Sequence, residues 1–146
     1  AQIEAGADCI QIFDSWGGLL DENYEELSLN YINQIASSVQ NDIPVILYTR
    51  DKLIDEIINS TPIKCFNLDS SDKIDKHIDK KIAVQGNFNP KNFHADKEEL
   101  KQMAQSFHTK YKDRKNYIFN LGSGLTPDIN PDKVGYFLNE LSSFSS

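Results

Sequence analysis

The chain has 146 residues, of which 39% are hydrophobic and 25% charged, and its net charge is −7. This composition is typical of one globular domain, and no apolar run approaches the roughly 18 residues of a membrane span. Lys and Arg form no basic cluster, so we expect neither nucleic acid nor a membrane surface as a partner. Residues 1–5, closed by Gly6, have the pattern of the end of a helix, which indicates a piece of a longer protein.

Five strand-like runs alternate with helical patterns. The expected strands cover residues 8–14, 45–49, 63–69, 82–87 and 117–121. Helices are expected over residues 23–40, after Asp51, after Ser71, after Asp96 and after Asn130. Asn23 with Glu26 has capping-box spacing, and so has Asp96 with Glu99. Pro131 suits the first position of the last helix, where its missing N–H costs nothing.

Three of these helices carry apolar stripes with a period of 3.6 residues. The stripe of the helix after Asp96 is Leu100, Met103, Ala104, Phe107 and Tyr111. The stripe of the first long helix is Tyr24, Leu27, Tyr31, Ile32, Ile35, Ala36 and Val39. The stripe of the last helix is Val134, Phe137, Leu138, Leu141 and Phe144. We expect these stripes to be the buried faces of their helices.

Strict alternation of strands and helices predicts an α/β fold with a parallel sheet, either open and doubly wound or part of a (β/α)8 barrel. Strand alternation places four amides on one face, which are Gln11, Asn67, Gln85 and Asn120. This favours a barrel interior that opens to a polar cavity. Residues 1–146 would then be one segment, about five βα units, from the C-terminal part of a TIM-type barrel. The alternative is that the amides bond one another in a buried sheet.

The strand ends are where a barrel places its site. Residues 14–18, 67–70, 85–90 and 120–124 are rich in Gly, Ser, Asn and Asp. Backbone N–H groups near Gly, together with Ser hydroxyls and Asn amides, favour an anionic ligand. Asp14 and Asp69 are either acid–base groups or hold the loops, and Trp16 either lines the mouth of the site or packs under the next helix.

Other chemistries find little support. Gly122 and Gly124 lack the third glycine of a dinucleotide loop, and no Gly-Lys-Ser/Thr of a P-loop occurs. The three histidines are expected to face solvent and lie far from the cysteines, so no metal site is expected; they are His77, His94 and His108. Cys9 and Cys65 are interpreted as small buried hydrophobes in a reducing compartment.

Four segments at these strand ends carry a resemblance to a known family. They are AGADCIQIFDSWGG at residues 5–18, PVILYT at 44–49, QGNFNP at 85–90 and IFNLGSGLTPD at 118–128. In this order and spacing the chain resembles the C-terminal portion of the uroporphyrinogen decarboxylase family. The resemblance implies a (β/α)8 barrel that is a cytoplasmic homodimer. It also implies a cofactor-free carboxy-lyase of haem biosynthesis, which converts the four acetates of uroporphyrinogen III to methyls and yields coproporphyrinogen III.

The resemblance also assigns site residues. Ser15 matches the residue that hydrogen-bonds a substrate carboxylate, Phe13 matches an aromatic that lines the cleft, and Ser123 stands where the family usually has His. Arg50 and Arg114 do not match the family's catalytic arginines. The catalytic Arg pair, Asp and Tyr lie upstream in the family, so no catalytic residue is expected here and these residues alone are expected to be inactive.

Two alternatives remain. One is a non-catalytic remnant that binds a porphyrin or another anion, which the Ser123 substitution allows. The other is a relative of the same fold that transfers methyl groups from corrinoids and binds zinc through His-x-Cys at a strand end. The corresponding strand ends Tyr48-Thr49-Arg50, which has neither ligand and disfavours this reading. We also expect the segment to be stable only with its N-terminal complement, because two sheet edges stay unpaired.

Overall fold

The computed structural model describes residues 1–39, 41–50, 54–77 and 81–144, and it contains a parallel five-stranded sheet in the order β1-β2-β3-β4-β5. The strands are β1 (Ile10–Asp14), β2 (Val45–Thr49), β3 (Cys65–Asn67), β4 (Ala83–Gln85) and β5 (Tyr117–Ile118). Each strand pairs in parallel with the next one along the chain. The fold is therefore α/β, with the strand order of consecutive βα units in a barrel wall.

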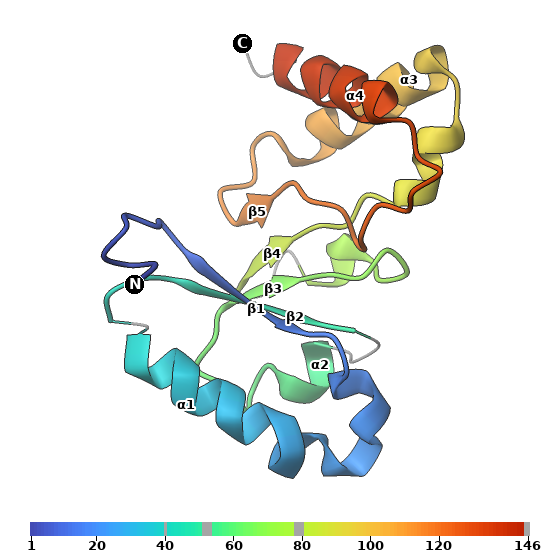
Figure 1. The fold of residues 1–146 in the computed structure, drawn as a ribbon. Coiled ribbons are helices and arrows are strands. Elements are labelled where there is room, and N and C mark those ends of the chain that lie inside the picture. The colour runs from blue at the N-terminus through green and yellow to red at the C-terminus, as the bar shows by residue number, and fades with distance from the viewer. Residues whose placement is uncertain (40, 51–53, 78–80, 145–146) are drawn as a thin grey trace.

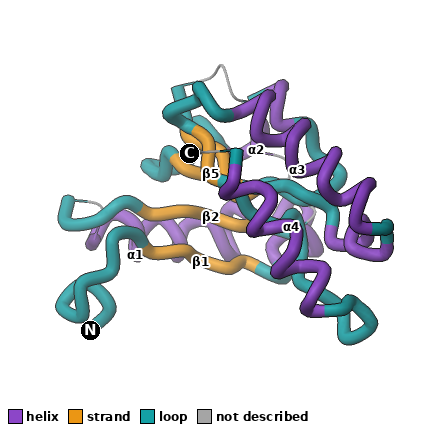
Figure 2. The backbone as a smooth tube through the Cα atoms, turned by 90° about the horizontal axis from the view of Figure 1, so that it is seen from above, coloured by secondary structure: helices purple, strands orange, loops and turns teal. Residues whose placement is uncertain are grey.

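The helices divide into two groups (Figure 1). The helical elements are η1 (Gly17–Asn23), η2 (Glu25–Leu29), α1 (Asn30–Val39), α2 (Ile54–Ile57), η3 (Ile74–Lys76), η4 (Pro90–His94), α3 (Lys97–Tyr111) and α4 (Pro131–Ser143). Helices α1 and α2 lie beside β1, β2 and β3, whereas α3 and α4 pack together beyond β5. Figure 2 shows β1 and β2 running side by side, with β1 at the outer edge of the sheet.

The strands are mostly shorter than expected. The second strand matches its expected bounds, but the others lose residues at their ends. The fifth run pairs at Tyr117–Ile118 and again only through an isolated bridge between Phe88 and Leu121. A strand extends only as far as the neighbouring strand stays within hydrogen-bonding distance. The residues of one strand alone do not determine that distance.

One helix expectation near the N-terminus was wrong, and another was right in extent, since residues 24–39 are helical, but wrong in its first turns and its cap. Residues 1–5 form turns that end at Gly6 with φ +88°, and no helix is assigned there. The helix expected over 23–40 is divided among η1, a π-helical turn (η2) and α1. Asn23 is the last residue of η1 and caps nothing in η2, where no side chain makes a capping hydrogen bond. The cap expected at Asp51 lies outside the described residues.

The capping signals of the later helices were confirmed. The Asp96 carboxylate accepts from the Glu99 N–H at 2.9 Å, and the Glu99 carboxylate accepts from the Asp96 N–H at 3.1 Å. Asn130 accepts from the Asp132 N–H at 2.8 Å, and Pro131 is the first residue of α4. Each pair lies within one helical turn, so it forms without help from the rest of the fold.

Two hydrophobic clusters hold the layers together. One joins α1 and α2 to the sheet, and the other is an aromatic cluster between the end of β4 and helices α3 and α4. In the latter, Phe88 and Phe137 have ring centroids 4.4 Å apart. Four stripe positions are nevertheless exposed, namely Leu27, Tyr31, Ile35 and Leu138. They lie on helix faces against which the described part of the chain packs nothing that covers them.

Two single-residue expectations also failed. Cys9 is exposed because it lies just before β1, the edge strand, whereas Cys65 is buried as expected. His77 is only 2% exposed, which is the opposite of the expected exposure. Its Nε2 lies 3.2 Å from the Asp72 carboxylate and its Nδ1 lies 3.8 Å from that of Asp55. His94 is exposed as expected, and His108 is half-buried. No helix in the described ranges is both long and apolar enough to cross a membrane.

Candidate functional site

A row of hydrogen-bonded amides crosses the inner face of the sheet. The Gln85 Nε2 group donates to Gln11 Oε1 at 2.9 Å and to Asn67 Oδ1 at 2.7 Å. The Asn120 Nδ2 group donates to the same Asn67 oxygen at 3.1 Å. The amides therefore do bond one another, as the alternative interpretation held. Gln11 Nε2, by contrast, is buried and makes no hydrogen bond to any described residue.

A cavity of about 500 Å³ lies over this row, at the carboxyl ends of the strands. Its lining residues are Gln11, Phe13, Ser15, Tyr48, Arg50, Asn67, Asn120, Leu121, Gly122, Ser123, Gly124 and Leu125. All three residues expected at the site, Phe13, Ser15 and Ser123, are among them. They come from opposite ends of the described sequence, and the parallel sheet brings them to one edge.

The cavity combines aromatic surface with hydrogen-bond donors. Phe13 is 67% exposed and lies against Tyr48, with ring centroids 5.8 Å apart. Ser15 and Ser123 supply hydroxyls, and Gln11 supplies the amide described above. This set suits a flat, partly apolar ligand with polar groups at its edge.

Arg50 is a site residue that the sequence analysis missed. It directly follows β2, and its backbone N–H donates to the Asp14 carbonyl at 3.2 Å, which ties the ends of β1 and β2. Among the described residues that line the cavity, Arg50 alone carries a charge, and none is acidic. An arginine and two serines in the lining of one cavity favour a carboxylate as ligand. Its position directly after a strand could have identified it as a site residue. It was set aside because it does not match the family's catalytic arginines.

The two strand-end carboxylates hold loops. Asp14 Oδ2 accepts from the Ser28 hydroxyl at 2.9 Å. Asp69 Oδ1 accepts from both the N–H and the hydroxyl of Ser71, each at 2.9 Å. Asp14 lines neither this cavity nor the adjoining one, which supports the loop-holding interpretation for that residue. Asp69 holds its loop as well, but it also lines the adjoining cavity. Trp16 is exposed and so does not pack under the next helix.

A second cavity of about 580 Å³ adjoins the first and shares Ser123 and Gly124 with it. It also reaches Lys91 and His94, whose Nε2 lies 3.2 Å from an Asp128 carboxylate oxygen. Here Gly122 allows close packing, because a Cβ at this position would lie 2.3 Å from the backbone nitrogen of Ser70. The loops after β3 and β5 thus meet beside Ser123.

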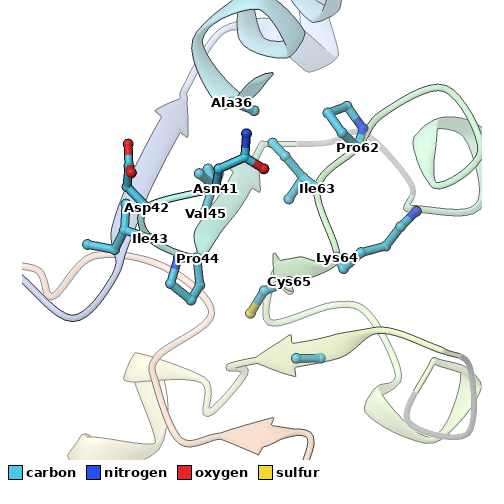
Figure 3. Close-up of a pocket in the computed structure, with 11 residues that line it drawn as sticks. Ala36, Asn41, Asp42, Ile43, Pro44, Val45, Pro62, Ile63, Lys64 and Cys65 are labelled. Atoms are coloured by element: carbon cyan, nitrogen blue, oxygen red, sulfur yellow. The ribbon is translucent and has the colours of Figure 1, made fainter. Parts of the chain in front are cut away.

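A third cavity, of about 490 Å³, lies at the opposite, amino ends of the strands (Figure 3). The side chains of Asn41 and Ile63 face each other across it, whereas Asp42 and Lys64 point outward. Its walls are largely apolar. Within the described ranges, no three His, Cys, Asp or Glu side chains gather as a metal ion would require.

Comparisons with known proteins agree with this architecture. The family described as uroporphyrinogen decarboxylase (URO-D) matches residues 1–144. The uroporphyrinogen decarboxylase of Pseudoalteromonas translucida is 34% identical over 100% of this chain and 44% of its own length. That of Hydrogenovibrio crunogenus is 36% identical over 99% of the chain and 44% of its length, and that of Pseudomonas putida (strain GB-1) is 34% identical with the same coverage.

The chain thus spans about 44% of the length of the curated relatives it matches. Its five consecutive parallel strands correspond to the C-terminal portion of the barrel on which that family is built. The chain therefore belongs to the uroporphyrinogen decarboxylase family.

Proposed function

We propose that the protein that carries this chain decarboxylates the four acetate side chains of uroporphyrinogen III to give coproporphyrinogen III. The observation that carries the proposal is the meeting of Phe13, Ser15 and Ser123 in one cavity with Arg50. Family membership over residues 1–144 supplies the reaction class, and the cavity's donors and positive charge match a substrate with eight carboxylates.

In this proposal the chain supplies a binding wall. The hydroxyls of Ser15 and Ser123 donate to substrate carboxylates, and Arg50 pairs with one of them. Phe13 and Tyr48, which lie against each other, offer apolar surface to a pyrrole ring. Holding the macrocycle in one orientation brings one acetate at a time to the reacting position.

The bond changes need no cofactor. A pyrrole ring is protonated, the bond between the acetate methylene and its carboxylate breaks, and carbon dioxide leaves. The electron pair of that bond passes to the protonated ring, and the methylene then takes a proton to become a methyl while the ring loses one. The acid and the arginine pair are expected from the part of the barrel that precedes this segment in the relatives. A cytoplasmic homodimer remains part of the proposal on the strength of the resemblance alone.

The test is decarboxylation by the gene product that carries these residues. Products with eight to four carboxylates are separated by chromatography after incubation with uroporphyrinogen III. Ser15→Ala and Arg50→Gln should each raise KM more than they lower kcat, since they remove binding of a carboxylate that does not react. Ser38→Ala is the matched control, because that exposed hydroxyl donates to the Ile35 carbonyl of its own helix, at 2.7 Å, and does not line the cavity.

The outcomes distinguish a decarboxylase from a non-catalytic porphyrin- or anion-binding protein. Loss of carboxylates from the substrate, together with higher KM values in both variants, supports the decarboxylase. Binding of uroporphyrin without turnover favours the non-catalytic porphyrin- or anion-binding remnant, for which the Ser123 substitution is the supporting observation. Absence of both binding and turnover overturns the proposal.

A further inference from the structure

Asp14 lies directly before Ser15, but its side chain leaves the cavity. As the last residue of β1 it shares the outer face with Ile12, by strand alternation. Its carboxylate accepts from the Ser28 hydroxyl at 2.9 Å, across the segment that contains η1. The hydrogen bond therefore spans residues 15–27, and residues 15–23 of that span run from the cavity wall through η1.

Gly17 allows the carboxylate to sit this close. A Cβ on Gly17 would lie 2.0 Å from Asp14 Oδ2 and 2.5 Å from the Tyr24 ring. Any side chain at position 17 would displace the carboxylate or the ring. Residues 14, 17 and 24 thus meet at one point under the 15–23 segment.

Tyr24 packs against Asp14 and Gly17 from the helix side. It is 3% exposed, and its burial, followed by the nearby Asp14 charge, raises the pKa of its phenol. The phenol therefore stays neutral beside the carboxylate. We call the cluster of Asp14, Gly17, Tyr24 and Ser28 the Asp14 seat.

The main chain of Asp14 also connects residues that line the cavity. Its carbonyl accepts from the Arg50 N–H at 3.2 Å, so Asp14 joins the two strand ends that carry Ser15 and Arg50. A shift of Asp14 would move both donors relative to Ser123 on the far side of the cavity.

We propose that Asp14 is a positioning residue, whose carboxylate, held by Ser28 against Gly17, fixes residues 15–23 and so presents the Ser15 hydroxyl to a substrate carboxylate. Its link to substrate rests on the proposed function. Asp14 touches no substrate and takes no part in the proton transfers.

The first test measures local order by amide hydrogen exchange in the gene product that carries this chain. Ser28→Ala removes the hydroxyl that donates to Asp14 at 2.9 Å, and Ser38→Ala removes an equally small hydroxyl from the same helical region. We expect exchange in residues 15–23 to rise roughly tenfold in Ser28→Ala and to stay unchanged in Ser38→Ala. Unchanged exchange in Ser28→Ala would overturn the inference.

The second test asks whether the effect passes through Ser15. The Kd of uroporphyrin, the oxidised macrocycle with the same carboxylates, is measured for the parent, Ser28→Ala, Ser15→Ala and the double variant. Ser28→Ala should weaken binding about fivefold in the parent and have no further effect once Ser15 is alanine. Ser28→Thr, which keeps the hydroxyl, should restore parental binding. Equal weakening in both backgrounds would contradict the proposed route through Ser15.

The two tests keep the inference separate from the proposed function. If the parent neither binds uroporphyrin nor decarboxylates uroporphyrinogen, the proposed function fails and hydrogen exchange still decides whether the Asp14 seat orders the loop. Should Ser28→Ala unfold the protein, Gly17→Ala perturbs the seat from its other side. It is expected to raise exchange in the same residues.

Discussion

The side chain of Gln85 donates to Asn67 Oδ1 at 2.7 Å, between the neighbouring strands β4 and β3. Both residues are buried, and the same oxygen accepts from Asn120. One carbonyl oxygen thus accepts from Gln85 in β4 and from Asn120 in the segment that follows β5, so Asn67 links β3 to both.

Replacing Asn67 with alanine should therefore destabilise the protein. Asn120 would lose this acceptor and Gln85 would keep only Gln11, so one or more buried donors would lack a partner. We expect the free energy of unfolding to fall by about 1–3 kcal/mol, measured by urea denaturation. Asn139→Ala, at an exposed position of α4, is the control and should change it little. An unchanged value for Asn67→Ala would mean that water replaces the lost acceptor.

Ser123→His should strengthen binding of a carboxylated macrocycle. Ser123 is exposed in the wall of both adjoining cavities, and a protonated imidazole there can form a charge-assisted bond. Such a bond is worth roughly 1.5 kcal/mol, or about tenfold in Kd for uroporphyrin. The gain should be larger at pH 6 than at pH 8, since histidine ordinarily titrates near pH 6.5. Ser123→Asn, which stays neutral, controls for size, and equal binding by serine and histidine proteins would refute the prediction.

The two thiols should differ in reactivity. Cys9 is exposed, whereas burial, with a smaller effect of Cys9, raises the pKa of the Cys65 thiol to about 11. Because the thiolate is the reactive form, iodoacetamide at pH 8 should label Cys9 and spare Cys65. Of these two thiols, intact-mass measurement should show one carbamidomethyl group added to the folded protein and two added after denaturation in urea. Rapid labelling of both thiols in the folded protein would contradict burial of Cys65.

The same thiol links stability to alkaline pH. Its ordinary pKa is 9.0 and rises to about 11 on folding, so the folded state keeps a proton that the unfolded state loses in this range. The contribution is present below pH 9 and is lost as the pH rises toward 11. Urea denaturation of the parent at pH 8.5 and pH 10.5 should show this fall, and Cys65→Ala should reduce its size. An identical pH dependence in that variant would exclude Cys65 as a source.

Residues 1–146 in isolation should not fold as a stable monomer. β1 and β5 are the terminal strands of the described sheet, each with one neighbour, and Leu27, Tyr31 and Ile35 form an exposed ridge. Open strand edges and apolar surface favour association. Circular dichroism should show no cooperative melting at high dilution, and sedimentation should show aggregates at higher concentration. A cooperative, concentration-independent transition of a monomer would disprove this expectation.

Much of the architecture was determined by the sequence alone, because it depends on short-range physics. The helix starts at Asp96 and Asn130 follow from hydrogen bonds within one turn. The shared face of the four amides follows from the two-residue period of a strand. The motifs at the strand ends then identified the family and named Phe13, Ser15 and Ser123, which lie together in the cavity.

Only the tertiary structure decided what these side chains contact. The Gln85–Gln11 hydrogen bond joins residues 74 positions apart, and no local pattern encodes that pairing. The burial of His77 and the exposure of Cys9 were likewise mispredicted, because each depends on what the neighbouring elements cover. Arg50 enters the site only because β2 ends beside β1. Local hydrogen bonds and periodicity act over a few residues, whereas a binding site is made by contacts between strands that only packing brings together.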